Sequence, residues 1–152
     1  MILSAKTIKR EVEIAPFVER TVHPETGMSY GLSIAGYDVR VREEVNLEPG
    51  RFMLASIIER IVMPRDVLAN VADKSTLRRM GITLGNTIIE PGWHGYLTVE
   101  INNHGPGLVR LPAGSPIGQI IFYRVDKPCR PYTGKYQGQG PAPVEATREE
   151  IA

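Results

Sequence analysis

The sequence contains a single cysteine, Cys129, among its 152 residues. One cysteine excludes an internal disulfide framework and a multi-cysteine zinc site. No stretch approaches the roughly 20 apolar residues that a membrane-spanning helix needs. The start, MILSAKTIKREVE, has no apolar run of signal-peptide length. We therefore expect a protein of the reducing cytoplasm that has no contact with a membrane.

The sequence also has almost no excess of either charge. The net charge is +1, so global electrostatics do not favour a nucleic acid or an anionic membrane as a partner. A hydrophobic fraction of 42% and a charged fraction of 23% are typical of an ordinary globular protein. A chain of this length can bury the core of one domain without a metal or disulfides.

Short β-branched runs, separated by Gly and Pro turns, dominate the chain from about residue 30 onward. YDVRVREEV, RFMLASIIERIVM, GYLTVEINN, GLVRLPAG and IGQIIFYRV alternate or form compact apolar runs, as β-strands do. A helix is predicted over residues 4–13 and a smaller one over residues 75–80. These patterns predict a mainly β domain, a barrel or a sandwich, over residues 1–126.

Residues 127–152 form a tail that is poor in apolar side chains and rich in Gly, Pro, Gln and charge. Such a composition alone favours a flexible segment. The two tyrosines, the lysine and the glutamines between its glycines leave a second interpretation open, in which the tail folds over a ligand.

Two short segments imitate a zinc-dependent base deaminase. Such enzymes use an H-x-E segment and a P-C-x-x-C segment, and the chain has HPE at residues 23–25 and Pro128-Cys129. The second cysteine is absent, and one thiolate with one imidazole leaves a tetrahedral zinc under-ligated. We expect no zinc and no protein-held metal.

The segment DKSTLRRMG, residues 73–81, concentrates hydroxyls and cations at the start of the predicted small helix. Such groups suit a phosphate, although a solvated and capped helix explains the same spacing. About twenty residues later, Glu100 lies on the polar face of a predicted strand, opposite Leu97, Val99 and Ile101. A carboxylate there is either a solvated strand residue or the base of a site.

Several motifs together resemble the dCTP deaminase branch of the dUTPase-like superfamily. They are LSAKTIKREVE, GYDVRV, the run from LEPGRFML to RRMGI, IIEPGWHGYLTVEINNHG, LPAGSPIGQIIFYRV and PYTGKYQGQ, in the family's order over about residues 2–139. The resemblance implies a distorted jelly-roll-like β-barrel and a homotrimer with active sites between subunits. It also implies zinc-independent hydrolysis of dCTP to dUTP and ammonia, with Mg²⁺ carried on the substrate triphosphate.

The same resemblance assigns roles to individual residues. It implies that Glu100 is the catalytic base, that Ser75 orients the water and contacts phosphate, and that Arg79 stabilises the site. The substrate-binding positions that it implies are Lys74, Thr76, Asn86, Thr87, Tyr132, Lys135, Tyr136 and Gln139. The last four belong to the part of the tail that closes over the triphosphate in this family.

The chain departs from the family where the base would bind. GNTIIEPG replaces the usual T-A-x-x-I-D-P-G, so that Gly85-Asn86-Thr87 stands where the family's backbone holds the water and the base, with Asn86 in place of a small residue. Lys74 replaces a more common arginine. Glu90 replaces an aspartate that activates water in dUTPases. Cleavage of dUTP to dUMP, alone or in a bifunctional enzyme, is therefore the alternative. A modified cytosine nucleotide as substrate and a non-catalytic nucleotide-binding regulator also stay open.

Overall fold

The computed structural model describes residues 1–85 and 87–150. Two helices and twelve strands form in the order α1 (Ala5–Glu11), β1 (Glu13–Ala15), β2 (Thr21–Val22), β3 (Ser29–Ser33), β4 (Gly36–Arg40), β5 (Val45–Leu47), β6 (Phe52–Val62), β7 (Val67–Asp73), α2 (Ser75–Arg79), β8 (Ile82–Leu84), β9 (Ile88–Ile89), β10 (His94–Asn103), β11 (Val109–Leu111) and β12 (Pro116–Arg124). The two predicted helices are thereby confirmed in place and type. None of the helices in the described part of the chain is long and apolar enough to cross a membrane.

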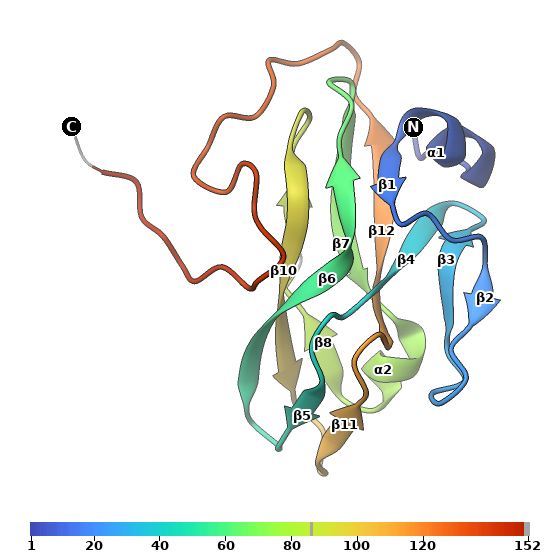
Figure 1. Cartoon of the computed structure of the whole chain (residues 1–152), viewed down its shortest axis with the longest axis vertical. Helices are drawn as coiled ribbons and strands as arrows, with labels where there is room; N and C mark the ends of the chain where they lie inside the picture. Colours follow the sequence, from blue (N-terminus) through green and yellow to red (C-terminus); the bar gives the residue numbers. More distant parts are fainter. Residues whose placement is uncertain (86, 151–152) are drawn as a thin grey trace.

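The strands form two larger sheets and one short ribbon, and every pairing between them is antiparallel (Figure 1). The first sheet has the order β1-β6-β10-β8 and the second has the order β2-β3-β4-β12-β7-β9, while β11 pairs with β5. An isolated bridge between Val41 and Ile57 links the two larger sheets. The expected mainly β, jelly-roll-like fold is confirmed, although within the described residues the sheets do not close into one barrel.

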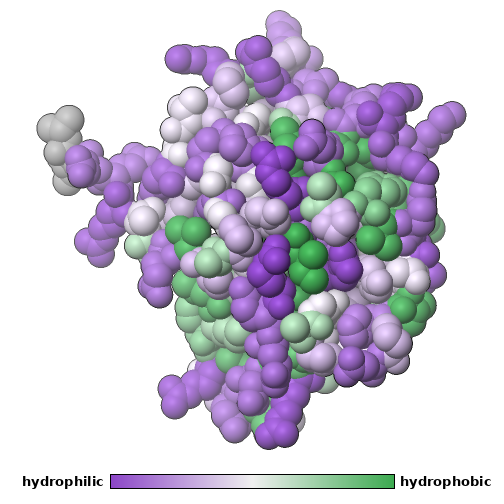
Figure 2. Space-filling view, viewed as in Figure 1, coloured by the Kyte–Doolittle hydropathy of each residue, from purple (hydrophilic) through white to green (hydrophobic). Residues whose placement is uncertain are grey.

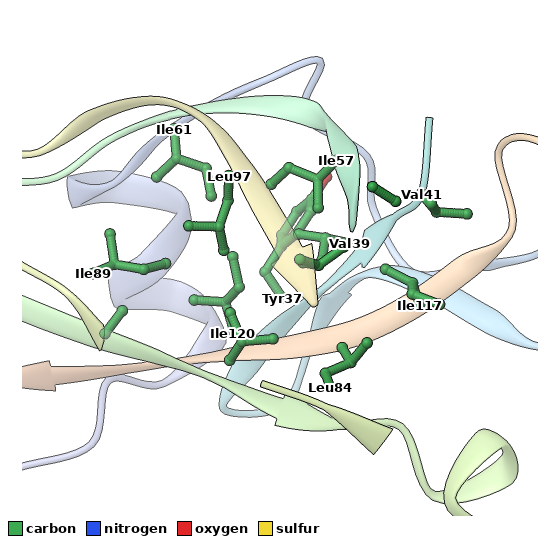
Figure 3. Packing of buried hydrophobic residues seen from close by; sticks show 14 of the residues in the cluster. Tyr37, Val39, Val41, Ile57, Ile61, Leu84, Ile89, Leu97, Ile117 and Ile120 are labelled. Carbon is green, nitrogen blue, oxygen red and sulfur yellow. The ribbon is translucent and has the colours of Figure 1, made fainter. Parts of the chain in front are cut away.

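The core lies between the two larger sheets, where apolar side chains from both meet (Figure 3). β4 and β12 contribute Tyr37, Val39 and Ile120, and β6 contributes Ile57 and Ile61 from the opposite side. Each of these five side chains is fully buried. Burial of this kind stabilises a fold by about 1.5–3 kcal/mol for each large aliphatic side chain.

β10 is the strand that positions the candidate site. Leu97, Val99 and Ile101 are buried as the alternation predicts, and Glu100 on the other face is half-buried. Thr98 departs from the prediction because it is only 7% exposed although it lies on the polar face. A register shift between Tyr96 and Thr98 interrupts the pairing with β6, and the C-terminal segment covers this face.

The C-terminal segment leaves the end of β12, passes over the tops of the neighbouring strands and descends along β10 (orange to red in Figure 1). A parallel bridge joins Gly95 to Gln139, and the backbone N–H of Tyr96 donates to the Gln139 carbonyl over 3.0 Å. The indole N–H of Trp93 donates to the Tyr136 carbonyl over 2.7 Å. The segment therefore packs on the domain, while its flexibility stays a prediction.

The surface seen in the same view is mostly hydrophilic, and apolar side chains show through it only in scattered groups (Figure 2). Apolar atoms contribute more than half of the surface of a typical folded protein, so such groups do not by themselves indicate a site. The features that bear on function are therefore the cavities and the polar groups that point into them.

Candidate functional site

A cavity of about 380 Å³ lies between β10 and the C-terminal segment. Its walls come from β6, the 87–93 stretch, β10 and the tail: Phe52, Leu54, Thr87, Ile88, Ile89, Glu90, Trp93, Leu97, Thr98, Glu100, Tyr132, Tyr136, Gln139, Val144, Glu145 and Ala146. Most of the lining is apolar or aromatic, with a few polar groups that converge on the space. This composition is typical of a small-molecule site.

Glu100 is the half-buried carboxylate of this cavity, and the stretch preceding β9 holds its side chain. The hydroxyl of Thr87 donates to Glu100 Oε2 over 3.2 Å. The backbone N–H of Gly85 donates to the Glu100 carbonyl over 2.9 Å. The absence of a side chain at Gly85 matters, because a Cβ atom there would stand 2.5 Å from Oε2. The carboxylate is thus fixed in a space that only a glycine leaves open.

The C-terminal segment brings three of the predicted tail residues, Tyr132, Tyr136 and Gln139, to the same cavity. The side-chain oxygen of Gln139 accepts from the Thr98 backbone N–H over 3.3 Å. Hydrogen bonding with Thr147 lowers the pKa of the Tyr136 phenol below its ordinary value. The fourth residue, Lys135, places its ammonium 5.2 Å from the centre of the Tyr136 ring.

The structure places the predicted phosphate-binding cluster elsewhere. Lys74 and Ser75 line a separate cavity of about 710 Å³, together with Arg20 and Gln119. The Lys74 ammonium lies 3.1 Å from Asp38 Oδ2, and both side chains are at most 10% exposed. Within one chain, Lys74 is therefore the partner of a buried carboxylate.

Arg79 and Thr76 are exposed on α2, and Arg79 lines a third, open depression beside Gly81 and Gly105. The structure therefore brings together Glu100, Thr87, Tyr132, Tyr136 and Gln139, and it places Lys74, Ser75, Thr76 and Arg79 outside that cavity. Asn86 lies outside the described residues.

Sequence reasoning missed three contributions to the cavity. Thr98 accepts a hydrogen bond from the Val144 backbone N–H over 3.0 Å, and Val144 with the next two residues lines the space. Trp93 anchors the tail through its indole. The sequence contains a signal for Thr98 alone, which shares the polar face of its strand with Glu100. The residues around position 144 look like ordinary linker sequence, so they provide none.

Across the described ranges 1–85 and 87–150, no three His, Cys, Asp or Glu side chains are grouped so as to hold a metal ion. Cys129 is a free thiol that is partly exposed. Its backbone N–H donates to the Arg65 carbonyl, and its own carbonyl accepts from Arg65 Nε. Cys129 thus belongs to a structural contact at the base of the C-terminal segment.

Comparison with known folds agrees with the sheet arrangement. The EIAV dUTPase has a TM-score of 0.60 and 17% identity, covering 83% of this chain and 98% of the viral chain. The dUTPase of Staphylococcus bacteriophage 80alpha has a TM-score of 0.60 and 16% identity, covering 85% of this chain and 99% of that one. At such low identity these neighbours establish a dUTPase-like fold.

Sequence comparison identifies the family. The family model described as dCTP deaminase-like matches residues 37–125. A dCTP deaminase of Acidobacterium capsulatum is 36% identical over 159 residues, which cover 83% of this chain and 86% of the relative. A dUMP-forming dCTP deaminase of Methanoculleus marisnigri is 38% identical over 115 residues, covering 72% of this chain and 62% of the relative. The chain therefore belongs to the dCTP deaminase-like family.

Proposed function

We propose that the protein hydrolyses the C4 amino group of dCTP without zinc and releases dUTP and ammonia. The observation that carries this proposal is the Glu100 carboxylate, which lies half-buried in a largely apolar cavity with one oxygen held by Thr87. A flat pyrimidine ring suits walls of this kind. Relatives that carry the name dCTP deaminase support the same reaction.

In the proposed reaction Glu100 acts first as a general base. It takes a proton from a water molecule as the water oxygen bonds to C4 of the cytosine, and it passes that proton to the ring nitrogen next to C4. The C4–N bond then breaks, and the amino group leaves as ammonia with the proton of the new hydroxyl. The carbonyl of uracil remains, so one water is consumed for each ammonia released.

The charges around the cavity bear on how the triphosphate is held. The ionisable side chains that line it include Glu90, Glu100 and Glu145, and no lysine or arginine of the described residues joins them. A triphosphate carries several negative charges, which such a site repels. The compensating cations must therefore come from groups outside the cavity lining of one chain.

We propose that a second and third copy of the chain supply them, in a homotrimer with shared sites. Arg79 on α2 carries a positive charge, and the hydroxyls of Ser75 and Thr76 lie on the same helix. None of the three lines the cavity of Glu100 in the same chain, which leaves them free to reach a neighbouring cavity. Mg²⁺ bound to the triphosphate would neutralise further charge without a protein carboxylate cage. Among proteins of the same fold, the 80alpha dUTPase is solved with dUPNHPP and a mutant of the phi11 dUTPase coordinates a structural Mg(II) ion, which supports a nucleotide and a magnesium ion as ligands of this fold. We place the reaction in the cytoplasm.

A second function, cleavage of dUTP to dUMP and pyrophosphate, is favoured by Glu90. This exposed carboxylate lines the same cavity as the half-buried Glu100, and it stands at the position where the resemblance to dUTPases implies a catalytic aspartate. The relative from Methanoculleus marisnigri bears the name of a dUMP-forming enzyme. A bifunctional enzyme would use both carboxylates in turn.

The test incubates purified protein and Mg²⁺ with dCTP or dUTP and separates the products by chromatography. We expect dCTP to become dUTP, and Glu100→Gln to lower this rate at least about 100-fold, since a general base contributes about 10²–10⁴-fold. Glu90→Gln is the matched variant, and it should abolish any dUMP while deamination continues. Full deamination by Glu100→Gln would refute the role of Glu100. No turnover of either nucleotide by the wild type would favour a modified cytosine nucleotide or a binding role.

A further inference from the structure

The two oxygens of the Glu100 carboxylate have different surroundings. Oε2 accepts the hydrogen bond from the Thr87 hydroxyl at 3.2 Å and lies against the backbone of Gly85. No side chain or backbone group within the described residues donates to Oε1. Among the described residues, the protein therefore engages the carboxylate through Oε2.

The group that holds Oε2 is itself fixed at the backbone on both sides. The Thr87 N–H donates to the Gly85 carbonyl over 2.9 Å, and the Thr87 carbonyl accepts from the Val71 N–H over 3.2 Å. Val71 lies on β7, and Gly85 bonds to Glu100 on β10. The hydroxyl thus stands on a backbone frame that connects both larger sheets.

The choice of threonine adds to this rigidity. A β-branched side chain has a restricted χ1 angle, so its hydroxyl keeps one direction with little entropic cost. The contact joins residues 13 positions apart in the sequence, and its acceptor is a carboxylate oxygen. A supporting group of this kind holds a reacting side chain near its productive geometry.

We propose that Thr87 is a positioning residue for the base of the reaction, an inference that rests on the proposed deaminase function. Its hydroxyl holds Oε2 and leaves Oε1 as the oxygen that takes the proton from water. Thr87 keeps its own proton throughout and forms no bond to the substrate. When Oε1 carries the proton, the Thr87 hydrogen bond still holds Oε2, so the acid delivers the proton from the same place.

A direct contact between the Thr87 hydroxyl and the nucleotide is the competing explanation, because Thr87 also lines the cavity. The two differ in kinetics. Loss of a substrate contact that is equal in the ground state and the transition state raises KM, whereas loss of base positioning lowers kcat. The separation of kcat from KM therefore distinguishes them.

The experiment measures kcat and KM for dCTP with Mg²⁺ in the wild type, Thr87→Val, Thr87→Ser and Thr83→Val. Valine keeps the shape and removes the hydroxyl, and serine restores it. Thr83 on β8 is the matched control, because its hydroxyl lies 3.1 Å from His104 Nε2 and does not line the cavity. A melting curve for each variant checks folding, and Thr87→Ala replaces valine if valine does not fold.

We expect Thr87→Val to lower kcat about 10-fold with KM within about twofold, as expected when a reacting group loses part of its alignment. Thr87→Ser should recover most of kcat, and Thr83→Val should match the wild type. An unchanged kcat in Thr87→Val, a rise in KM alone, or a serine variant as slow as valine would overturn the inference while the deaminase function stands. A wild type without dCTP turnover would overturn both.

Discussion

Gly85→Ala is a sensitive test of how closely the backbone approaches the reacting carboxylate. A Cβ atom at Gly85 would stand 2.5 Å from Glu100 Oε2, 3.2 Å from its Cβ and 3.3 Å from its Cδ. Ordinary contact begins at 3.4 Å, so the carboxylate would have to move by about 0.9 Å. A displacement of about 1 Å at a reacting group can lower a rate about 100-fold. We expect a fall of that size in kcat for dCTP.

The assay is a steady-state measurement of ammonia release from dCTP, with the melting temperature measured in parallel. Gly85 does not have a positive φ angle, so alanine adds no backbone strain and the melting temperature should change little. Gly107→Ala is the matched control, because a Cβ there meets no atom within 4 Å. If kcat stayed within about twofold of the wild type in folded Gly85→Ala, the close packing of Glu100 would not matter for catalysis.

Two buried ionisable groups give predictions on stability. Glu59 is fully buried and accepts from the Arg40 N–H over 3.0 Å and from Arg40 Nε over 2.8 Å. Glu59→Ala should lower the free energy of unfolding in urea by about 3 kcal/mol, because it leaves the Arg40 guanidinium unpaired. Glu59→Gln should lower it by less, because burial already raises the pKa of Glu59 and so favours an uncharged side chain there. Equal losses in the two variants would contradict this. Burial raises the pKa of Tyr37 from 10.0 to about 12, so its contribution to stability is complete below pH 10 and is lost as the pH rises through 12. That loss is about 3 kcal/mol, from about two pKa units at about 1.4 kcal/mol each. A Tyr37→Phe protein with the same decline as the wild type above pH 10 would refute the attribution.

The fold was largely predictable from the sequence, because its determinants are local. Alternating apolar residues specify which face of a strand is buried, and the Gly and Pro turns specify where strands end. Leu97, Val99 and Ile101 are buried as the alternation requires. The helix α2 also forms where it was predicted, with Leu77 as its buried residue.

The surroundings of single side chains were less predictable, because they depend on contacts between distant parts of the chain. Thr98 is buried through a register shift in β10 and a tail residue 46 positions away. Lys74 pairs with Asp38, which precedes it by 36 positions. No local pattern specifies either contact. A motif can therefore identify the residue types of a site, while the topology decides which of them share a cavity.

Glu90 and Glu100, two of the three carboxylates that line the cavity, differ in a way that fits two chemical tasks. Glu100 is half-buried on a strand of ten residues, and hydrogen bonds to neighbouring backbone and to Thr87 fix it. A base that acts on an uncharged ring benefits from a rigid and partly dry position. Glu90 is exposed beside a proline turn, where water and a metal-bound phosphate have access. Because environments that differ in this way separate the roles of paired carboxylates, we propose deamination for Glu100 and any phosphate chemistry for Glu90.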